Sequence, residues 1–416
     1  MKIYLETYGC TANKSDESLI LGLLKEDKHE IVKNMDDADV LILLTCTVIG
    51  TTEQRMLSRL RIFKKTGKKI IVVGCMASVQ SELLKNLAPD AKLLPAQYSY
   101  QIVDLLNDKK VSFNIKNKTL FPKYFDEIIA PISIAEGCMF SCSYCITSIA
   151  RGKLKSYPSD EIIKDVYSAL KQGCREIQLT AQDTSSYGLD SGRNLGELLN
   201  DVCKIEGEYR IRVGMMNPYT ALKNLDSIIS AYDSYKIYKF LHLPVQSGDD
   251  EILQKMNRKY TTNDFSEITK RFRKRYQNIT ISTDVIVGFP TETDEQFQHT
   301  INLIKDVTPD IVNITRYSAR PYTTAKTLKG RIKTEIVKER SKLLTEVCSK
   351  ISRERNQQHI GKNYSILITE IGKRNTFVGR AENYKPVVIR DNVNLGEIVD
   401  VEIIDAAATY LLGNLI

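Results

Sequence analysis

Three cysteines lie close together in the run AEGCMFSCSYC, namely Cys138, Cys142 and Cys145. The apolar segment PISIAEG precedes them and predicts a strand that leads into a tight loop. Four thiolates complete an ordinary iron-sulfur cluster or structural zinc site, so three thiolates would leave one metal position open. An open metal position is typical of catalytic sites rather than of structural ones.

Two other interpretations of this loop are a zinc site that lacks a histidine and a group of buried small residues. The chain has only four histidines and none lies near the loop, so a zinc ion would need a distant fourth ligand. The C-x3-C-x2-C spacing resembles that of the radical S-adenosylmethionine enzymes. That resemblance implies a 4Fe-4S cluster whose open iron binds the amino and carboxylate groups of S-adenosylmethionine, and whose reduction releases a deoxyadenosyl radical.

A second set of cysteines follows three apolar segments in the N-terminal part of the chain. KIYLETYGC ends at Cys10, DVLILLTC ends at Cys46 and KIIVVGC ends at Cys75, and a helical pattern follows each. This alternation predicts a doubly wound parallel sheet, whose ligands bind beyond the carboxyl ends of the strands. One such cysteine alone would be interpreted as a buried apolar residue. The three together predict a second metal site, again with one open position.

The composition is that of a folded intracellular enzyme. The chain has 416 residues, of which 42% are hydrophobic and 26% charged, which predicts two or three domains. The N-terminal residues do not resemble a signal peptide, and no apolar run approaches the roughly 18 residues that would cross a membrane. We therefore expect a soluble, cytoplasmic protein whose cysteines are metal ligands or core residues rather than disulfides. Cys174, Cys203 and Cys348 lie in or beside helical patterns and are predicted to be core residues.

Residues from about 130 to 330 alternate between apolar segments and amphipathic helical patterns, with six strand candidates. In one of these helices, SDEIIKDVYSALKQG, we expect Ser159 to be the N-cap and Gly173 to end the helix. Six parallel repeats are fewer than the eight of a closed barrel, so the sequence predicts a partial barrel with a lateral opening. Polar residues at the strand ends are expected to line the active face as a set, although any one of them could be a turn or cap residue: Gln182, Asp183, Asn217, Gln246, Gly288 and Arg316.

Beyond residue 330 the chain first forms a basic helical pattern and then short alternating segments with Gly and Asn turns. About sixty residues of this kind suit a small β-barrel of the oligonucleotide-binding type. Basic and aromatic residues alternate in it, a mixture that binds phosphates and stacks on bases. The net charge of +8 favours a nucleic-acid partner, although surface charge can also serve solubility alone. The residues concerned are Lys362, Tyr364, Lys373, Arg374, Phe377, Arg380, Tyr384, Lys385 and Arg390.

These three blocks in this order resemble the radical methylthiotransferases over essentially the whole chain. The resemblance implies an N-terminal cluster domain at residues 1–115, a radical S-adenosylmethionine partial barrel at 124–355 and a C-terminal TRAM RNA-binding domain at 356–416. It also implies that Cys10, Cys46 and Cys75 hold an auxiliary 4Fe-4S cluster beside the one at Cys138, Cys142 and Cys145. We expect the contacts with S-adenosylmethionine among Gln182, Asn217, Gln246 and Gly288. Further matching runs are ARG at 150–152, LTAQDTSSYG, LPVQSGDD, MNRKYT, VGFPTET and GRAENYKPVVI.

Two short runs resemble the archaeal and eukaryotic branch that acts on threonylcarbamoyladenosine in tRNA: CITSIARG, which contains Thr147, and RVGMMNP. The resemblance implies methylthiolation of C2 of this nucleoside next to the anticodon. The barrel cluster would generate the radical that removes hydrogen from C2, and the auxiliary cluster would carry a sulfur that a second S-adenosylmethionine methylates. The implied partners are tRNA and an electron donor such as a flavodoxin or ferredoxin, with no membrane.

Four alternatives stay open at this point. The first two are methylthiolation of isopentenyladenosine in tRNA and methylthiolation of an aspartate in a ribosomal protein. The third, a radical enzyme with unrelated chemistry, would carry similar clusters. The fourth, a non-catalytic RNA-binding protein with structural metal, would not explain two sites of three thiolates each.

Overall fold

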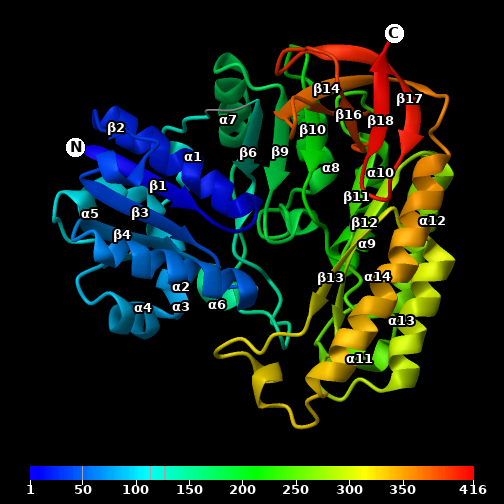
Figure 1. The fold of residues 1–416 in the computed structure, drawn as a ribbon, viewed down its shortest axis with the longest axis horizontal. Helices are drawn as coiled ribbons and strands as arrows, with labels where there is room; N and C mark the ends of the chain where they lie inside the picture. The colour runs from blue at the N-terminus through cyan, green and yellow to red at the C-terminus, as the bar shows by residue number, and fades with distance from the viewer. Residues whose placement is uncertain (49, 113, 126–127) are drawn as a thin grey trace.

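The computed structural model describes residues 1–48, 50–112, 114–125 and 128–416. Three parts follow one another along the chain and lie side by side (Figure 1): a blue N-terminal part, a green central part and a red C-terminal barrel. Within the described ranges, no helix combines the length and hydropathy needed to cross a membrane.

The N-terminal part is a five-stranded parallel sheet with the strand order β2-β1-β3-β4-β5. Apolar clusters cover both of its faces, as expected for a doubly wound sheet. Its strands are β1 (Lys2–Thr7), β2 (Glu30–Ile31), β3 (Val40–Thr45), β4 (Lys69–Gly74) and β5 (Lys92–Pro95). Its helices are α1 (Thr11–Glu26), α2 (Gly50–Lys65), α3 (Cys75–Val79), α4 (Ser81–Leu87) and α5 (Ile102–Leu106).

The central part contains six parallel strands in two three-stranded sheets, ordered β10-β9-β6 and β11-β12-β13. A parallel bridge between Ile211 and Ile237 links the two sheets, so the prediction of a partial barrel is confirmed. The six parallel strands are β6 (Ile129–Ser133), β9 (Glu176–Thr180), β10 (Arg210–Val213), β11 (Phe240–His242), β12 (Thr280–Val287) and β13 (Ile311–Arg316). Two short strands, β7 (Ala135–Glu136) and β8 (Lys155–Ser156), pair beside the cysteine loop.

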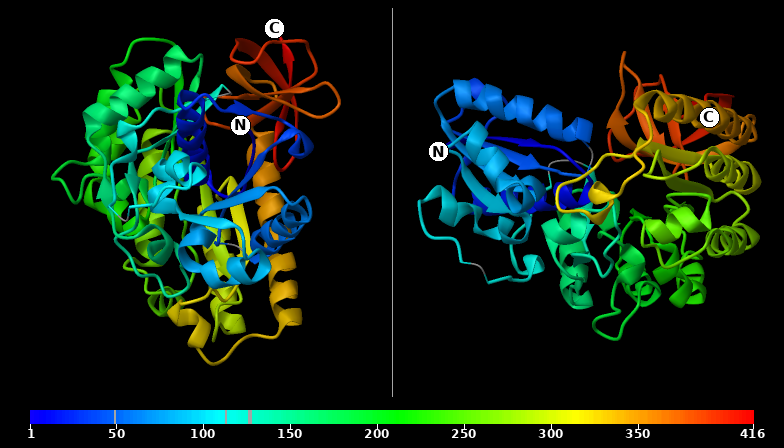
Figure 2. Two further views of the ribbon diagram at one scale, coloured as in Figure 1. Left: turned by 90° about the vertical axis from the view of Figure 1, so that its left-hand side faces the viewer. Right: turned by 90° about the horizontal axis from the view of Figure 1, so that it is seen from below.

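Helices cover the outer face of these strands and bury a large apolar core against them (Figure 2). They are α7 (Ser159–Lys171), α8 (Leu195–Cys203), α9 (Pro218–Lys223), α10 (Leu225–Ala231), α12 (Thr262–Arg275) and α13 (Asp294–Val307). Two further helices lie elsewhere: α6 (Thr147–Arg151) packs against α3 of the N-terminal part, and α11 (Asp250–Lys255) belongs to a small separate apolar cluster. Short 3-10 helices are η1 (Met35–Asp37), η2 (Ala96–Gln101), η3 (Lys118–Leu120), η4 (Thr184–Ser186) and η5 (Thr324–Thr327).

One predicted cap is wrong. Ser159 is the first residue of α7, Pro158 occupies the N-cap position, and no side chain caps the helix. The Ser159 hydroxyl accepts a hydrogen bond from Arg193 instead, so it serves a tertiary contact. The predicted end is right, because α7 ends at Lys171 and Gly173 beyond it has a φ of 93°, a left-handed conformation that favours glycine.

Helix α14 (Thr334–Gln357) leads into the C-terminal part, which is a closed five-stranded barrel as the sequence predicted. The strand order is β14-β15-β16-β18-β17, and apolar side chains fill the interior. The strands are β14 (Asn363–Ile371), β15 (Phe377–Arg380), β16 (Pro386–Ile389), β17 (Ile398–Ala406) and β18 (Leu411–Leu415).

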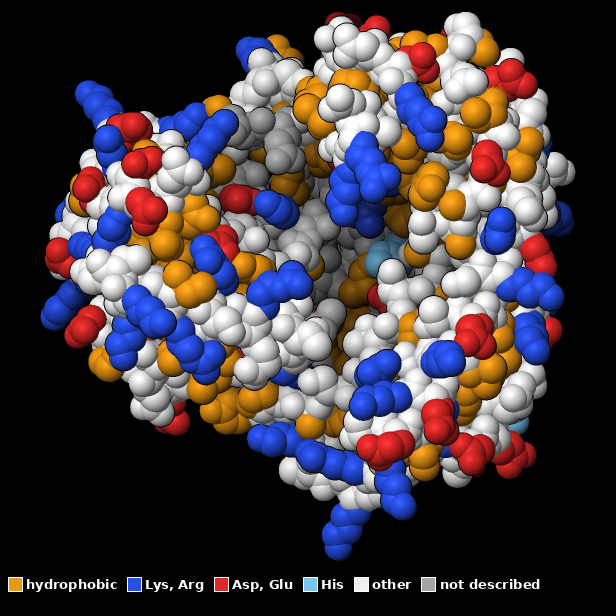
Figure 3. Space-filling view, viewed as in Figure 1, with side chains coloured by type: hydrophobic (Ala, Val, Ile, Leu, Met, Phe, Trp, Pro, Cys, Tyr) orange, Lys and Arg blue, Asp and Glu red, His pale blue; other side chains and the backbone are white. Residues whose placement is uncertain are grey.

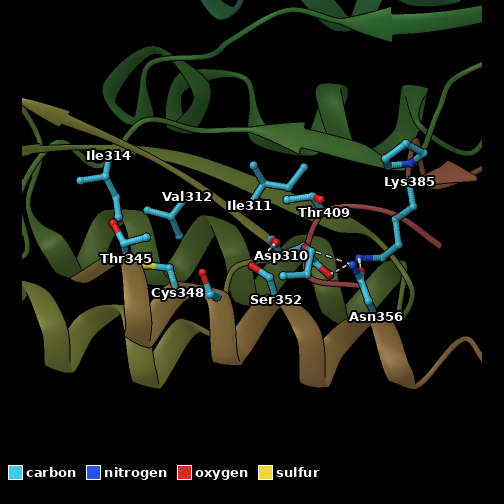
Figure 4. A pocket seen from close by; sticks show the side chains of 13 residues that line it. Asp310, Ile311, Val312, Ile314, Thr345, Cys348, Ser352, Asn356, Lys385 and Thr409 are labelled. Carbon is cyan, nitrogen blue, oxygen red and sulfur yellow. Dashed lines mark hydrogen bonds and ion pairs between the residues drawn. The ribbon is translucent and has the colours of Figure 1, made fainter. Parts of the chain in front are cut away.

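A buried ion network fixes the C-terminal barrel to the central part (Figure 4). Asp310 lies directly before β13 and accepts hydrogen bonds from Lys385 Nζ at 2.8 Å and Arg355 Nε at 2.7 Å, both to its Oδ1. Lys385 Nζ also donates to Asn356 Oδ1 at 2.7 Å. Burial alone would raise the pKa of Asp310, but Lys385 and Arg355 outweigh burial and lower it. The carboxylate therefore stays charged at the centre of this junction.

A tyrosine of the C-terminal barrel reaches the amino ends of the central strands. The Tyr384 hydroxyl donates to Glu176 Oε1 at 2.9 Å, and its ring centroid lies 4.8 Å from that of Tyr238 and 5.0 Å from that of Phe240. Lys385, at 4% exposure, and Tyr364, at 8%, are buried. The expectation that these residues bind RNA is therefore wrong for Tyr364, Tyr384 and Lys385, whose side chains serve the junction or the barrel interior. Four of the predicted basic residues are exposed: Lys362, Lys373, Arg374 and Arg390.

Candidate active site

All six predicted cluster cysteines line one cavity of about 470 Å³ between the N-terminal sheet and the partial barrel. Figure 3 shows a hollow between these two parts, with Lys and Arg side chains on both sides of it. Each triad thus comes from a different part of the chain, and both open toward the same space. The cavity could therefore bring one bound molecule close to both groups of thiols.

The N-terminal triad lies at the carboxyl ends of three neighbouring strands, β1, β3 and β4. Cys10 is the N-cap residue of α1, Cys46 directly follows β3, and Cys75 is the first residue of α3. Gly74 precedes Cys75 with a φ of 102°, and a Cβ atom there would lie only 2.5 Å from the Thr45 carbonyl oxygen. This glycine lets the chain turn tightly against the neighbouring strand and places Cys75 next to Cys46.

Hydrogen-bond donors point at each sulfur of the barrel triad. The Phe140 backbone N–H donates to Cys138 Sγ at 3.5 Å, and the Thr147 backbone N–H donates to Cys145 Sγ at 3.4 Å. Arg258 Nη1 donates to Cys142 Sγ at 3.3 Å. Donors of this kind stabilise thiolates and help to set the reduction potential of an iron-sulfur cluster.

The electrostatics of both triads also fit a metal cluster. Burial first, and then the neighbouring thiols Cys10 and Cys75, raise the pKa of Cys46 to about 12. Burial likewise raises the pKa of Cys138 to about 12. Thiolates at such positions need a nearby positive centre, which bound iron would provide.

Within the described residues, no three His, Cys, Asp or Glu side chains are close enough to hold a single metal ion. A cubane cluster holds its thiolates further apart than one ion does, because the iron and sulfur atoms of the cluster lie between them. Three thiols in each triad would hold three irons of such a cluster and leave the fourth iron open.

A buried network of four charges joins the two triads. Arg151 ends α6, which follows Cys145, and its Nη2 donates to Asp16 Oδ2 at 2.7 Å on α1, which begins beside Cys10. Arg151 Nη1 donates to Glu136 Oε1 at 3.1 Å. Lys118 Nζ completes the network with Asp16 Oδ1 at 2.8 Å and Glu136 Oε1 at 2.9 Å. Two cations and two anions balance, so this network can be buried between the two parts without a net charge.

Three of the four residues predicted to contact S-adenosylmethionine line the cavity. Gln182 presents a buried Oε1 that has no hydrogen-bond partner in the described part of the chain. Asn217 caps α9 by accepting from the Tyr219 backbone N–H at 3.1 Å, and Gln246 has a φ of 71° beside β12. Gly288 is not among the lining residues; its N–H donates to Glu292 Oε2 at 3.0 Å. The contacts of all four with S-adenosylmethionine stay predictions.

Further polar side chains in the cavity did not stand out in the sequence. His242 Nε2 lies 3.1 Å from Asp284 Oδ1, and Asn313 Nδ2 donates to the same oxygen at 2.8 Å. Burial alone would raise the pKa of Asp284, but these two partners bring it below its ordinary value. Arg212 on β10 also lines the cavity. Successive side chains of a strand point to opposite faces of the sheet, and this alternation could have indicated which residues face the cavity.

Three protein families match this chain. The Radical SAM superfamily matches residues 132–304 and so includes the barrel triad. The Uncharacterized protein family UPF0004 matches residues 2–95 and includes the N-terminal triad. The TRAM domain matches residues 357–416, the C-terminal barrel.

Curated relatives match over the full length. The probable threonylcarbamoyladenosine tRNA methylthiotransferase of Archaeoglobus fulgidus is 42% identical over 100% of this chain and 99% of its own. The protein of the same name from Methanothermobacter thermautotrophicus is 39% identical over 100% of this chain and 99% of its own. The ribosomal protein uS12 methylthiotransferase RimO of Clostridioides difficile is 33% identical over 100% of this chain and 99% of its own.

Solved structures of radical S-adenosylmethionine enzymes share the fold. The methyltransferase TsrM from Kitasatospora setae, with cobalamin and a 4Fe-4S cluster bound, superposes with a TM-score of 0.57. The match covers 88% of this chain and 80% of TsrM at 11% sequence identity. At this identity the likeness concerns the fold alone.

Proposed function

Because this chain belongs to the radical S-adenosylmethionine methylthiotransferases, we propose that the cavity shared by its two cysteine triads is the site at which tRNA is methylthiolated. The reaction is the methylthiolation of C2 of N6-threonylcarbamoyladenosine. Its cofactors are S-adenosylmethionine and 4Fe-4S clusters. The observation that carries the site assignment is the position of both triads on one cavity, because sulfur insertion at an unreactive carbon needs a radical source and a sulfur source at the same atom.

We assign one cluster to each triad. Cys138, Cys142 and Cys145 would hold the cluster that binds S-adenosylmethionine, and the N-terminal triad would hold the auxiliary cluster. When bound, the two clusters supply the radical chemistry and the sulfur that the fold itself lacks. The protein places both triads on one cavity and donates hydrogen bonds to the sulfurs of the barrel triad.

The reaction needs an electron from outside the chain. We assign this role to a small redox protein such as a flavodoxin or ferredoxin, because one-electron reduction at low potential is the chemistry of such carriers. We place the enzyme in the cytoplasm, where its tRNA substrate is modified.

Expression in a host that lacks this tRNA modification tests the proposal. Mass spectrometry of digested tRNA should detect a methylthio derivative of threonylcarbamoyladenosine with the wild-type chain and none with Cys142→Ala. Unchanged tRNA from a preparation that contains both clusters would contradict the proposal. The isopentenyl base and then ribosomal protein uS12, the substrate named for the relative in Clostridioides difficile, would be the next substrates to test.

We expect the binding of tRNA to depend steeply on salt. If Lys362, Lys373, Arg374 and Arg390 each contact one phosphate, affinity should fall roughly fiftyfold to a hundredfold between about 50 and 200 mM salt. Replacing Lys373 and Arg374 with glutamine should reduce the slope of log affinity against log salt by roughly 1.5, measured by fluorescence anisotropy.

The matched control removes two charges from the N-terminal part, by replacing the exposed Lys64 and Lys65 at the end of α2 with glutamine. An equal loss of slope in both double variants would attribute the effect to net charge rather than to the C-terminal barrel.

A further inference from the structure

One arginine of the cavity, Arg212, has a buried N–H group without a hydrogen-bond partner in the described part of the chain. Arg212 lies on β10, and its guanidinium carbon is 5.2 Å from the ring centroid of Phe240 and 5.4 Å from that of Tyr384. Its Nε is buried and has no hydrogen-bond partner among the described residues. Taking a guanidinium out of water between two aromatic rings is costly unless a further group pairs with its N–H donors.

The other cations of the cavity are accounted for. Arg151 pairs with Asp16 and Glu136, and Arg320 pairs with Glu53. Arg258 donates to Cys142, and Arg316 lies at the exposed end of β13, where water solvates it. Arg258 and Arg212 both lack a carboxylate partner in the described part of the chain, but Arg258 donates to a thiol and to the Tyr260 hydroxyl, whereas the buried Nε of Arg212 has no hydrogen-bond partner there.

The carboxylates that line the cavity are also occupied. Asp284 accepts from Asn313 and lies beside His242. Asp183 is buried and accepts from Thr220 and from its own neighbour Ser185. Neither acid forms an ion pair with Arg212, so the negative group that would complete this site comes from a bound molecule.

We propose that Arg212 binds the carboxylate of the threonine moiety of the substrate base. This inference rests on the proposed function. In N6-threonylcarbamoyladenosine the amino acid is attached through its nitrogen, so its carboxylate is free and is the negative charge of the modified base. A guanidinium fork matches a carboxylate with two parallel hydrogen bonds. The rings of Phe240 and Tyr384 hold the guanidinium and leave its outer N–H groups for such a ligand.

Tyr384 acts here as a positioning residue. Its hydroxyl donates to Glu176 Oε1 at 2.9 Å and accepts from Gln178 Nε2 at 3.2 Å, so the ring behind Arg212 is fixed on its far side. Through Tyr384 the C-terminal barrel thereby supports a residue that lines the cavity, although Tyr384 itself is not among the lining residues.

The test compares two RNA stem-loops that differ in one group: a threonylcarbamoyladenosine stem-loop and its carboxyl methyl ester. The full-length enzyme with both clusters and S-adenosylmethionine, but without reductant, should bind the ester about tenfold to a hundredfold more weakly than the acid. In Arg212→Met this difference should vanish, because the acid should lose affinity to the level of the ester. Arg212→Lys should recover part of it.

Arg210→Met is the matched control, since it removes the other arginine of β10, which is not among the residues that line the cavity, and it should preserve the preference for the acid. Equal binding of acid and ester by the wild-type chain would overturn the inference while methylthio product on the acid substrate still supported the proposed function. A preference that persists in Arg212→Met, together with weaker binding of S-adenosylmethionine, would assign Arg212 to the cofactor's carboxylate and also overturn it. A wild-type enzyme that forms no methylthio product on this stem-loop would overturn the proposed function itself.

Discussion

Cys142→Ala should reduce both the cleavage of S-adenosylmethionine and the formation of methylthio product to background, whereas Cys46→Ala should abolish the product alone. The reason is the separation of the two triads: Cys142 belongs to the barrel loop, and Cys46 follows strand β3 of the N-terminal sheet. Each variant should retain about four of eight iron atoms, because one 4Fe-4S cluster would remain. Chromatography of 5′-deoxyadenosine and mass spectrometry of the tRNA measure the two activities separately.

Cys203→Ala provides the matched control, since Cys203 ends α8 and packs against the central core rather than lining the cavity. It should keep the full iron content and both activities. If Cys46→Ala lost the cleavage of S-adenosylmethionine as completely as Cys142→Ala, the division of roles between the triads would be wrong.

Arg151→Met should destabilise the chain by about 3–5 kcal/mol, because it leaves Asp16 and Glu136 with Lys118 as their one remaining cation. The buried excess of negative charge lies where α1 meets α6. Because each of these helices adjoins one triad, the two triads should no longer be held in a fixed position relative to each other. The shift of the first unfolding transition in urea measures the loss. Asp16→Asn in the same chain should recover part of it, since the network would again be balanced.

An exposed ion pair provides the comparison for this experiment. Lys342 and Glu346 lie 4.0 Å apart on the surface of α14, and Lys342→Met should change stability by less than about 0.5 kcal/mol. Equal effects at Arg151 and Lys342, or a double variant less stable than Arg151→Met alone, would contradict the assignment of a balanced buried network.

The acidic limit of stability follows from the same network. Burial would raise the pKa of Asp16, but Arg151 and Lys118 outweigh burial and hold it below its ordinary value. A carboxyl group with a lowered folded-state pKa stabilises the fold above its unfolded pKa and loses that contribution as the pH falls through the lowered value. The network should therefore persist through mildly acidic conditions.

The convergence of the cysteines within each triad could be predicted from the sequence. Residues come close together in space when they follow neighbouring parallel strands or lie within one short loop. Cys10, Cys46 and Cys75 follow three apolar segments, and in a parallel sheet the carboxyl ends of neighbouring strands meet at one edge. Cys138, Cys142 and Cys145 lie within one loop, so their convergence needs no long-range contact. The closed C-terminal barrel was likewise predictable from the change to short alternating strands.

Contacts between distant segments could not be predicted in this way. Composition does not distinguish a lysine that binds phosphate from one that pairs with a buried acid, and Lys385 finds Asp310 seventy-five positions away. Arg151 meets Asp16 across 135 positions for the same reason. Alternation along β10 places Arg210 and Arg212 on the same face of the strand, but it does not show which of the two arginines lies at the cavity.

Tyr384 contacts both Glu176 and Arg212, so the C-terminal barrel could not be exchanged for another without the loss of these contacts. A C-terminal barrel taken from another RNA-binding protein could offer equivalent basic loops, yet it would leave Glu176 and Arg212 without the side chain of Tyr384. If Arg212 binds the base as proposed, replacing the chain after α14 should weaken recognition of the base as well as attachment of the RNA. The two barrels therefore depend on each other at this junction, although a single helix, α14, connects them in the chain.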